Sequence, residues 1–356
     1  MQKNGKSRAS GGRMKLTFSA IIVGFKRKDY IFRAVSSVLS QDYPKDLVEI
    51  IVVKAFKDDD LDYFLENNKV ISLFSDTLSN GESLSKGIRS SSKEVICLLD
   101  DDDIFAPNKF DEISKLLEDE SHHADMIING YYRMDEDENS ISHGSFKKKS
   151  HTMNCELNNI VLRREDLDSK IWETREIYFN TSRISLRRKN AHGLCDFLET
   201  IPYTCDTAIT LYRIVMNLEI GYTDSILTGY RVNQKSISQY KNFSNDLRTL
   251  GKIIEKEIKS YAKILSFVND NEQSLRERLI ILLSFLNLRL AYAYGGRIQI
   301  CKKTINTLKQ VIRYKNKRTY GLYPKLNLYI YRDFIFLPFI LLLPKTFCKF
   351  RLTSFY

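Results

Sequence analysis

The sequence predicts an α/β fold in which a mostly parallel sheet is flanked by helices. Short apolar runs rich in β-branched residues, typical of buried strands, recur at 18–23, 48–53, 70–74 and 95–99. Segments with apolar residues at helical spacing lie between these runs. Alternation of strands and helices over residues 17–130 is the pattern of a layered α/β domain.

The first unit of this domain is a strand, a helix and a second strand. The strand over 18–23 is followed by a helix over 28–41, whose apolar positions include Ile31, Ala34 and Val38. Pro44 ends the helix, because the residue before a proline disfavours helical backbone. The second strand, over 48–53, is then expected to pair in parallel with the first through a right-handed crossover.

The next elements lead to the second half of the chain. After the strand over 70–74 we expect a helix over 81–91, and Pro107 is expected to open another helix, since proline suits the first helical position. A further strand begins at 126. The remaining expectations are a polar surface loop over 131–150, short strands within 156–231, a helix near 203–217, and helices beyond 240 that include an apolar one over 275–292.

Four consecutive aspartates, Asp100–Asp103, directly follow the strand predicted over 95–99. Ligand sites in open α/β sheets lie beyond the carboxyl ends of such strands. Carboxylates this close repel one another unless a cation neutralises them, and oxygen ligands suit Mg²⁺ or Mn²⁺. The run therefore predicts a divalent metal site that shares its ion with substrate phosphates. A solvated acidic turn is the alternative, and the flanking strand and helix argue against it.

Composition narrows the class of protein. The six cysteines show no paired spacing, so we expect reduced thiols and neither a disulfide framework nor a zinc site. Residues 1–16 are polar and basic and lack the apolar stretch of a secretory signal. We therefore expect a disordered basic tail and a cytoplasmic protein.

Positive charge is concentrated at the end of the chain. Residues 301–356 hold twelve Lys and Arg against the single acid Asp333, whereas the preceding residues balance 43 basic against 43 acidic side chains. The apolar run 334–343 lies in this segment and is too short to span a bilayer. Two interpretations stay open: peripheral association with an anionic membrane face, or a helix buried in the core. Nucleic acid is not an expected partner, because basic charge alone is a weak signal.

Several segments resemble family 2 glycosyltransferases with the GT-A fold. The resemblance is strong over residues 17–130 and weaker over 180–237. The matching segments are Ser19–Arg27 for the opening strand and turn, Arg33–Pro44 for the first helix and its Gln-x-Tyr-Pro end, Glu49–Val53 for the second strand, and Leu99–Asp103 with Pro107 for the Asp-x-Asp-Asp element.

The resemblance implies an inverting transferase that moves a sugar from a nucleotide-diphosphate sugar to a hydroxyl group. The cofactor would be Mg²⁺ or Mn²⁺, and the acceptor a lipid-linked or polymeric glycan. The resemblance also implies a GT-A domain over 17–237 and a helical, basic C-terminal region over 238–356. A nucleotidyltransferase is an alternative, although only Gly24 stands where its glycine-rich loop is usual, and a non-catalytic basic protein is another.

The resemblance also assigns roles to particular residues. Asp102 would be the main metal ligand, Asp100 would face the donor ribose and the metal, and Asp103 would support the site or, alternatively, cap the next helix. Asp101 would point to the other side of the chain and have a more structural role near the donor. The other donor contacts would come from Val23, Gly24, Phe25, Arg27, Lys54 and Arg231.

The family's position for the general base falls on Asp206, so the resemblance implies that Asp206 is the base. Cys205 precedes it, where the family has a glutamate. Two alternatives stay open: Asp206 is an ordinary helix N-cap, or Glu199 is the base. Arg231 either pairs with donor phosphate or is an exposed strand residue, and Asn233 replaces a frequent histidine.

Lys54 stands where the family has an aspartate that reads the nucleotide base, so base recognition is expected to differ or to use Asp58, Asp59 or Asp60.

Overall fold

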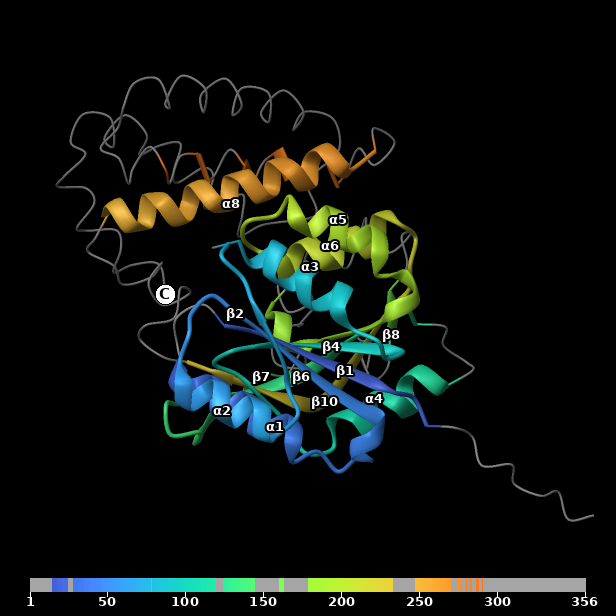
Figure 1. The fold of residues 1–356 in the computed structure, drawn as a ribbon. Helices are drawn as coiled ribbons and strands as arrows, with labels where there is room; N and C mark the ends of the chain where they lie inside the picture. The colour runs from blue at the N-terminus through green and yellow to red at the C-terminus, as the bar shows by residue number, and fades with distance from the viewer. Residues whose placement is uncertain are drawn as a thin grey trace, which may run out of the picture.

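The computed structural model describes residues 15–24, 28–77, 79–119, 124–144, 160–162, 179–232 and 247–269, with scattered positions between 275 and 290. A 10-stranded sheet forms its centre, with the order β3-β2-β1-β4-β9-β6-β10-β5, while β7 pairs with β6 and β8 with β10. Helices lie on both sides of this sheet (Figure 1). The predicted α/β fold is confirmed.

The first half of the sheet is parallel, as the strand–helix alternation predicts. β1 pairs in parallel with both β2 and β4, and β2 pairs in parallel with β3. The bounds are β1 Phe18–Gly24, β2 Val48–Lys54, β3 Ile71–Phe74 and β4 Val95–Asp100.

The second half of the sheet is mixed. β9 is antiparallel to β4 and β6, β10 is parallel to β6, and β5, β7 and β8 add antiparallel pairs. The bounds are β5 Ile104–Phe105, β6 Met126–Met134, β7 Ser140–Gly144, β8 Ile160–Leu162, β9 Ile184–Arg187 and β10 Ile220–Arg231.

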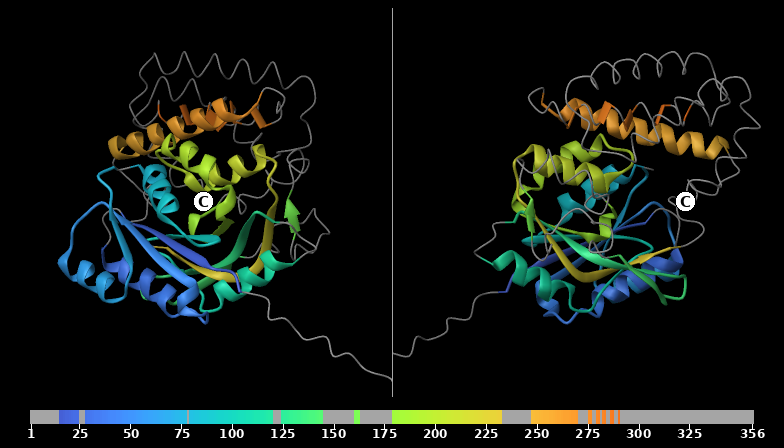
Figure 2. Two further views of the ribbon diagram at one scale, coloured as in Figure 1. Left: turned by 45° about the vertical axis from the view of Figure 1, so that its right-hand side comes forward. Right: turned by 180° about the vertical axis from the view of Figure 1, so that it is seen from behind.

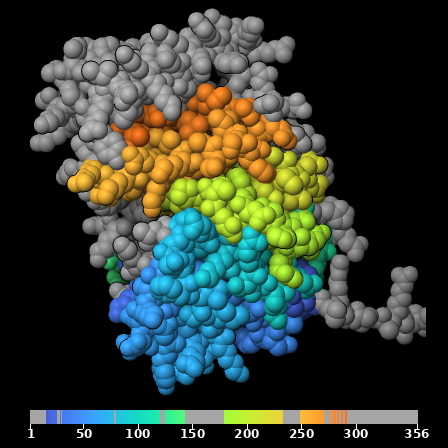
Figure 3. Space-filling model, turned by 45° about the horizontal axis from the view of Figure 1, so that its top comes forward, coloured from blue at the N-terminus to red at the C-terminus, as the bar shows by residue number. Residues whose placement is uncertain are grey.

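The helices form a layer on each face. Figure 2 shows α1, α2 and α4 below the sheet, α3, α5 and α6 above it, and α8 outside that upper layer. The space-filling view in Figure 3 shows α8, in orange, lying against the green surface of α5 and α6. The bounds are α1 Lys28–Leu39, α2 Asp59–Asn67, α3 Asn80–Ser90, α4 Lys109–Glu118, α5 His192–Glu199, α6 Cys205–Val215 and α8 Leu247–Phe267.

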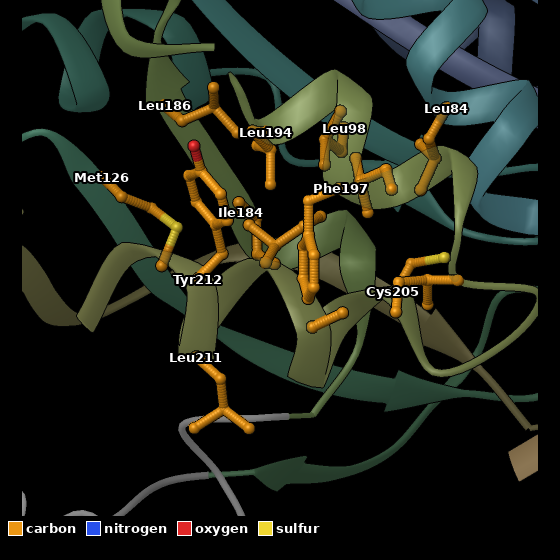
Figure 4. Close-up of a cluster of buried hydrophobic side chains, with 14 of the residues drawn as sticks. Leu84, Leu98, Met126, Ile184, Leu186, Leu194, Phe197, Cys205, Leu211 and Tyr212 are labelled. Carbon is orange, nitrogen blue, oxygen red and sulfur yellow. The ribbon is translucent and has the colours of Figure 1, made fainter. Parts of the chain in front are cut away.

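Successive residues of a strand contribute to different layers of the core, on opposite faces of the sheet. Ile21 packs with the α3, α5 and α6 layer, and its neighbour Ile22 packs with the α1, α2 and α4 layer. Figure 4 shows part of the upper cluster, where Cys205 lies among side chains such as Phe197 and Leu84. Burial on both faces explains why these strands read as nearly continuous apolar runs.

Gly81 allows the upper helices to pack closely. A Cβ at this position would lie 2.0 Å from the carbonyl oxygen of Leu198 and 2.3 Å from that of Ile201. The Gly81 N–H instead donates to the Ile201 carbonyl at 3.2 Å. The start of α3 therefore rests directly on the backbone that leads from α5 to α6.

Three expectations need correction. Pro107 does not open α4, which begins at Lys109 after the N-cap Asn108. The polar stretch from 131 is not wholly a loop, because β6 continues to Met134 and β7 follows; Tyr131 and Met134 are buried, which the charged residues around them obscure. α2 and α5 were not expected, since each is short, at nine and eight residues.

The helical expectation beyond residue 240 is confirmed over α8. The tail 1–14, the apolar run 334–343 and the whole of 301–356 lie outside the described residues, as does the predicted domain boundary at 237, which stays a prediction. Among the described residues, no helix combines the length and the apolar character needed to cross a membrane.

Candidate functional site

The carboxyl ends of β1, β2 and β4 meet at one edge of the sheet. In the strand register Gly24 faces Lys54, and Val23 faces Asp100. Four residues that the sequence assigned to donor or metal binding are therefore neighbours in space. Phe25 and Arg27, assigned with them, lie outside the described residues.

Asp100–Asp103 form a tight turn at the end of β4. The N–H of Asp103 donates to the Asp100 carbonyl at 3.2 Å, and Asp101, Asp102 and Asp103 are only 2%, 9% and 1% exposed. Burial, together with the charges of Asp103, Asp102 and Asp101, raises the pKa of Asp100 well above its usual value. A cation placed here would relieve that repulsion.

Asp103 fixes the back of this turn. Its Oδ2 accepts from Asn180 Nδ2 and from Ser182 Oγ, each at 2.7 Å, and its Oδ1 accepts from the Arg231 N–H at 2.9 Å. Burial and the charge of Asp102 raise the pKa of Asp103 to about 7, against these bonds. The alternative that Asp103 caps the next helix is wrong, because Asn108 is the N-cap of α4.

Arg231 is fully buried, so the alternative of an exposed strand residue is wrong. β10 lies between β6 and β5, which covers both of its edges. The Nε of Arg231 donates to the Asp102 carbonyl at 2.8 Å, and its terminal nitrogens hold the Asp135 and Glu136 carbonyls and the Glu138 carboxylate. Pairing of Arg231 with donor phosphate stays a prediction.

Asp206 lies second in α6, and the N-cap is Thr204, so the N-cap alternative for Asp206 is wrong. The Asp206 carboxylate accepts from the Asn180 N–H at 3.0 Å and from the Thr207 N–H at 2.7 Å. Its charge adds to the rise in the pKa of Asp100, which brings the predicted base and the predicted metal ligand into one site.

The other residues considered for the base are differently placed. Cys205 is 4% exposed, and burial, with the charges of Asp206 and Asp100, raises its pKa well above the usual value. It is therefore a neutral thiol and no substitute for a glutamate. Glu199 accepts from Ser85 and Arg89, both on α3, so its carboxylate belongs to the interface between α3 and α5.

Lys54 is buried although it stands at the carboxyl edge. Its Nζ lies 2.6 Å from Asp62 Oδ1 on α2 and donates to the Phe56 carbonyl at 3.0 Å. Asp58 is the N-cap of α2 and pairs with Lys28. Asp58 and Asp62 are thus paired with Lys28 and Lys54. A role for these residues in recognising the nucleotide base stays a prediction.

Asn180, Ser182 and Lys109 belong to the site but were not found from the sequence. Asn180 and Ser182 bind Asp103, and Lys109 Nζ donates to the Ser182 carbonyl at 2.8 Å and to Asn129 Oδ1 at 3.0 Å. The only local signal is the polar stretch that precedes β9. Lys109 was hidden because a lysine in the first turn of a helix is normally exposed.

Three fully buried basic side chains lie near the turn formed by Asp100–Asp103. Lys109, Arg183 and Arg231 are each 0% exposed, and Asp103 lies near enough to Lys109 to affect its pKa. These three basic side chains are fewer than the five carboxylates of Asp100–Asp103 and Asp206, and burial lowers the pKa of Lys109 to about 7, so its charge is only partly present at neutral pH. In the part of the chain that the structure describes, no group of three or more His, Cys, Asp or Glu side chains is arranged to hold a metal ion by itself.

The comparison with protein families agrees with the resemblance found in the sequence. The model for "Glycosyl transferase family 2" matches residues 19–194, about half of the chain. No curated protein matches this chain in sequence.

Similar solved structures include S. aureus TarS 1–349 (15% identity, 83% of this chain and 92% of that chain, TM-score 0.48) and its complex with UDP-GlcNAc (14% identity, the same coverage, TM-score 0.48). A third, S. aureus TarS, is 16% identical over 82% of this chain and 55% of that chain, with a TM-score of 0.46.

The matched range contains the strands, the first helix and the acidic turn on which the resemblance rested. Asn233, which belongs to the weaker part of that resemblance, lies outside the described residues. The family match, on an α/β fold that carries its acidic turn at the carboxyl edge of the sheet, shows that the chain belongs to glycosyl transferase family 2.

Proposed function

We propose that this glycosyltransferase moves a sugar from a nucleotide-diphosphate donor to a hydroxyl acceptor with inversion at the anomeric carbon. One observation carries the proposal: Asn180 donates both to Asp206 Oδ2 on α6, at 3.0 Å, and to Asp103 Oδ2 in the turn after β4, at 2.7 Å. Two carboxylates from distant parts of the chain thus share one hydrogen-bonding partner, which supports metal-assisted transfer with a general base.

Asp206 would take the proton of the acceptor hydroxyl. Because the backbone N–H groups of Asn180 and Thr207 bind one oxygen each, the carboxylate has a fixed orientation. The acceptor oxygen then bonds to the anomeric carbon as the bond to the diphosphate breaks, and that electron pair leaves with the diphosphate. Attack from the face opposite the diphosphate inverts the anomeric centre.

Asp102 and Asp100 would hold Mg²⁺ or Mn²⁺. Such an ion supplies a Lewis acid for the leaving diphosphate. The donor set fits this arrangement, since the two carboxylates offer hard oxygen ligands and the substrate phosphates would complete the coordination. The excess of carboxylates over buried cations favours a bound cation.

The acceptor would be a lipid-linked or polymeric glycan, in the synthesis of a glycolipid, a polysaccharide or a glycoprotein glycan. Two features favour a site of action at an anionic membrane face. Residues 301–356 hold twelve basic side chains. Separately, Arg248, Lys252, Lys256, Lys259 and Lys263 are exposed on α8, and their spacing puts them on one side of the helix.

A thermal-shift screen tests the proposal. The full chain is heated with UDP-, GDP-, dTDP- and CDP-glucose, each with and without Mn²⁺, because a ligand that binds only the folded state raises the apparent melting temperature. We expect one donor class to give a shift that requires Mn²⁺. Asp102→Ala should lose this shift and stay folded, and Asp46→Asn, an exposed acid before β2, should keep it. An Mn²⁺-dependent shift that Asp102→Ala retains would exclude the metal assignment.

A further inference from the structure

Asn180 joins the two catalytic halves of the site. Its backbone N–H donates to Asp206 Oδ2 at 3.0 Å, and its side-chain Nδ2 donates to Asp103 Oδ2 at 2.7 Å. Its Oδ1 accepts from the Ser182 N–H at 2.7 Å. One residue, 7% exposed, thus contacts both the acidic turn after β4 and the predicted base on α6.

The backbone of Asn180 has an unusual conformation. Its φ is 70° and its ψ is 119°, a region that is unfavourable for a residue other than glycine. Thr204, which precedes Asp206 at the start of α6, also has a positive φ of 57°. Both segments that meet at Asp206 therefore turn through backbone that persists only where the surroundings hold it.

Ser182 makes the link to the acidic turn double. Its hydroxyl donates to Asp103 Oδ2 at 2.7 Å and accepts from the Asp100 N–H at 2.9 Å. Ser182 also holds the backbone of β4, and its own carbonyl accepts from Lys109 and Thr228. The segment that carries Asn180 is consequently anchored to the sheet on the side of the acidic turn.

We propose that Asn180 is a positioning residue that sets the distance and orientation of Asp206 relative to the acidic turn. The inference rests on the proposed function, since it takes Asp206 as the base and the turn as the donor site. Asn180 does not touch the reacting atoms. Its side chain locks the 180–182 segment onto Asp103, and its backbone N–H carries that fixed position to the Asp206 carboxylate.

The substitutions separate the side chain from the backbone. Asn180→Gly removes the bond to Asp103 but keeps the N–H to Asp206 and adopts positive φ freely. Asn180→Asp keeps the size of the side chain and turns the donor into an acceptor that faces Asp103. The double variant Asp103→Asn with Asn180→Asp exchanges donor and acceptor and leaves the net charge unchanged. Asn217→Gly is the matched control, because Asn217 has a φ of 56° after the far end of α6.

The experiment measures kcat, KM and nucleotide affinity for the full chain. Release of nucleoside diphosphate from UDP-, GDP-, dTDP- and CDP-glucose, with water as acceptor, gives kcat and KM, and calorimetry gives the Kd for the free nucleotide. We expect Asn180→Gly to lower kcat at least tenfold and Asn180→Asp at least a hundredfold, with Kd within threefold of wild type. The exchanged pair should recover at least tenfold in kcat over Asn180→Asp, although the Ser182 hydroxyl then meets an amide N–H at residue 103, and Asn217→Gly should leave kcat unchanged.

Hydrogen exchange separates failure of this inference from failure of the proposed function. Asn180→Gly should speed amide exchange in peptides that cover 98–104 and 204–208, and the exchanged pair should restore the protection. If the wild type turns over no nucleotide sugar, faster exchange in both peptides still supports the link while the proposed function fails. An unchanged kcat in Asn180→Gly, or unchanged exchange in both peptides, would overturn the inference.

Discussion

The guanidinium of Arg231 holds the backbone of Asp102. Its Nε donates to the Asp102 carbonyl at 2.8 Å, while its other nitrogens bind the turn between β6 and β7 at Asp135, Glu136 and Glu138. The predicted metal ligand is therefore positioned from the strand beside it. This relationship gives Arg231 a structural role whether or not it also meets donor phosphate.

Arg231→Lys is expected to weaken both the fold and the site. A lysine keeps the charge but cannot reproduce the planar fork, and hydrogen bonds of charged groups contribute about 1.5–3 kcal/mol each. We expect the free energy of unfolding in urea to fall by several kcal/mol and the Mn²⁺-dependent affinity for nucleotide to drop.

The control for Arg231 is Arg33→Lys. Arg33 binds the same Glu136 carbonyl and Glu138 carboxylate, and its side chain is 47% exposed. Its replacement should change stability by about 0.5 kcal/mol or less and leave nucleotide affinity unchanged. Equal effects of the two substitutions would show that Arg231 acts only by holding the turn between β6 and β7.

Asp206→Asn is expected to separate binding from chemistry. The amide retains the size of the carboxylate but cannot take a proton, so nucleotide affinity should persist while kcat falls about 100-fold or more. Glu199→Gln is the comparison, because its carboxylate is bound to Ser85 and Arg89 on α3. If Glu199→Gln loses turnover and Asp206→Asn does not, the base has been assigned to the wrong residue.

The sequence predicted the parts of the site whose signal is local. The apolar run that ends at Asp100 identifies a buried strand, and the carboxyl end of such a strand is where a ligand site is expected. Asp206 was found through its place in the family pattern. Asn180 could not be found in either way, because its partners are 26 and 77 residues away and its role depends on a positive φ.

Burial of charged side chains was the other limit. Arg231 ends a strand and Lys109 begins a helix, positions at which side chains usually reach solvent. Both are 0% exposed here, because β10 is covered on both edges and α4 starts against the sheet. Nothing within a few residues of either one shows this, since the covering elements come from distant parts of the chain.

Lys54 is expected to tune recognition of the nucleotide base, but the test must include Asp62. Lys54→Asp alone would place a carboxylate beside Asp62, which lies 2.6 Å from Lys54 Nζ, and the two would repel. In the double variant Lys54→Asp with Asp62→Asn, the new acceptor should strengthen UDP binding by about 0.5–1.5 kcal/mol, one hydrogen bond. Asp62→Asn alone is the reference, and equal UDP affinity of the two would refute the prediction.

Lys109 is expected to make stability depend on pH. Burial, with the charge of Arg183, lowers its pKa to about 7 from 10.5. Between these values the unfolded chain binds a proton that the folded chain does not, so this group adds stability as pH rises and removes it as pH falls toward 7. The contribution changes by about 1.4 kcal/mol per pH unit.

The measurement compares wild type with Lys109→Met in urea at pH 7, 8 and 9. Methionine keeps much of the apolar stem and cannot titrate. The difference in unfolding free energy, wild type minus variant, should rise with pH across this range. A constant difference would mean that Lys109 stays protonated in the folded state, with its charge held by Asn129, Ser182 and Thr228.

The basic side of α8 is expected to bind anionic membranes. Arg248, Lys252, Lys256, Lys259 and Lys263 are exposed along one side of the helix, with Glu255 as the one exposed acid beside them. Each basic residue near an anionic surface contributes about 1 kcal/mol, and salt screens this term within roughly 10 Å. Lys256→Glu with Lys263→Glu should therefore weaken binding to phosphatidylserine vesicles at least tenfold.

The matched control reverses two exposed charges elsewhere. Arg188 and Lys189 lie in the short turn between β9 and α5, so Arg188→Glu with Lys189→Glu changes the net charge equally without touching α8. Co-sedimentation of the full chain at low and high salt should show weaker binding for the α8 pair alone. Equal losses in both pairs would indicate attraction by net charge, with no preferred face. Unchanged binding in both would assign the contact to residues 301–356, which keep all twelve of their basic side chains in these variants.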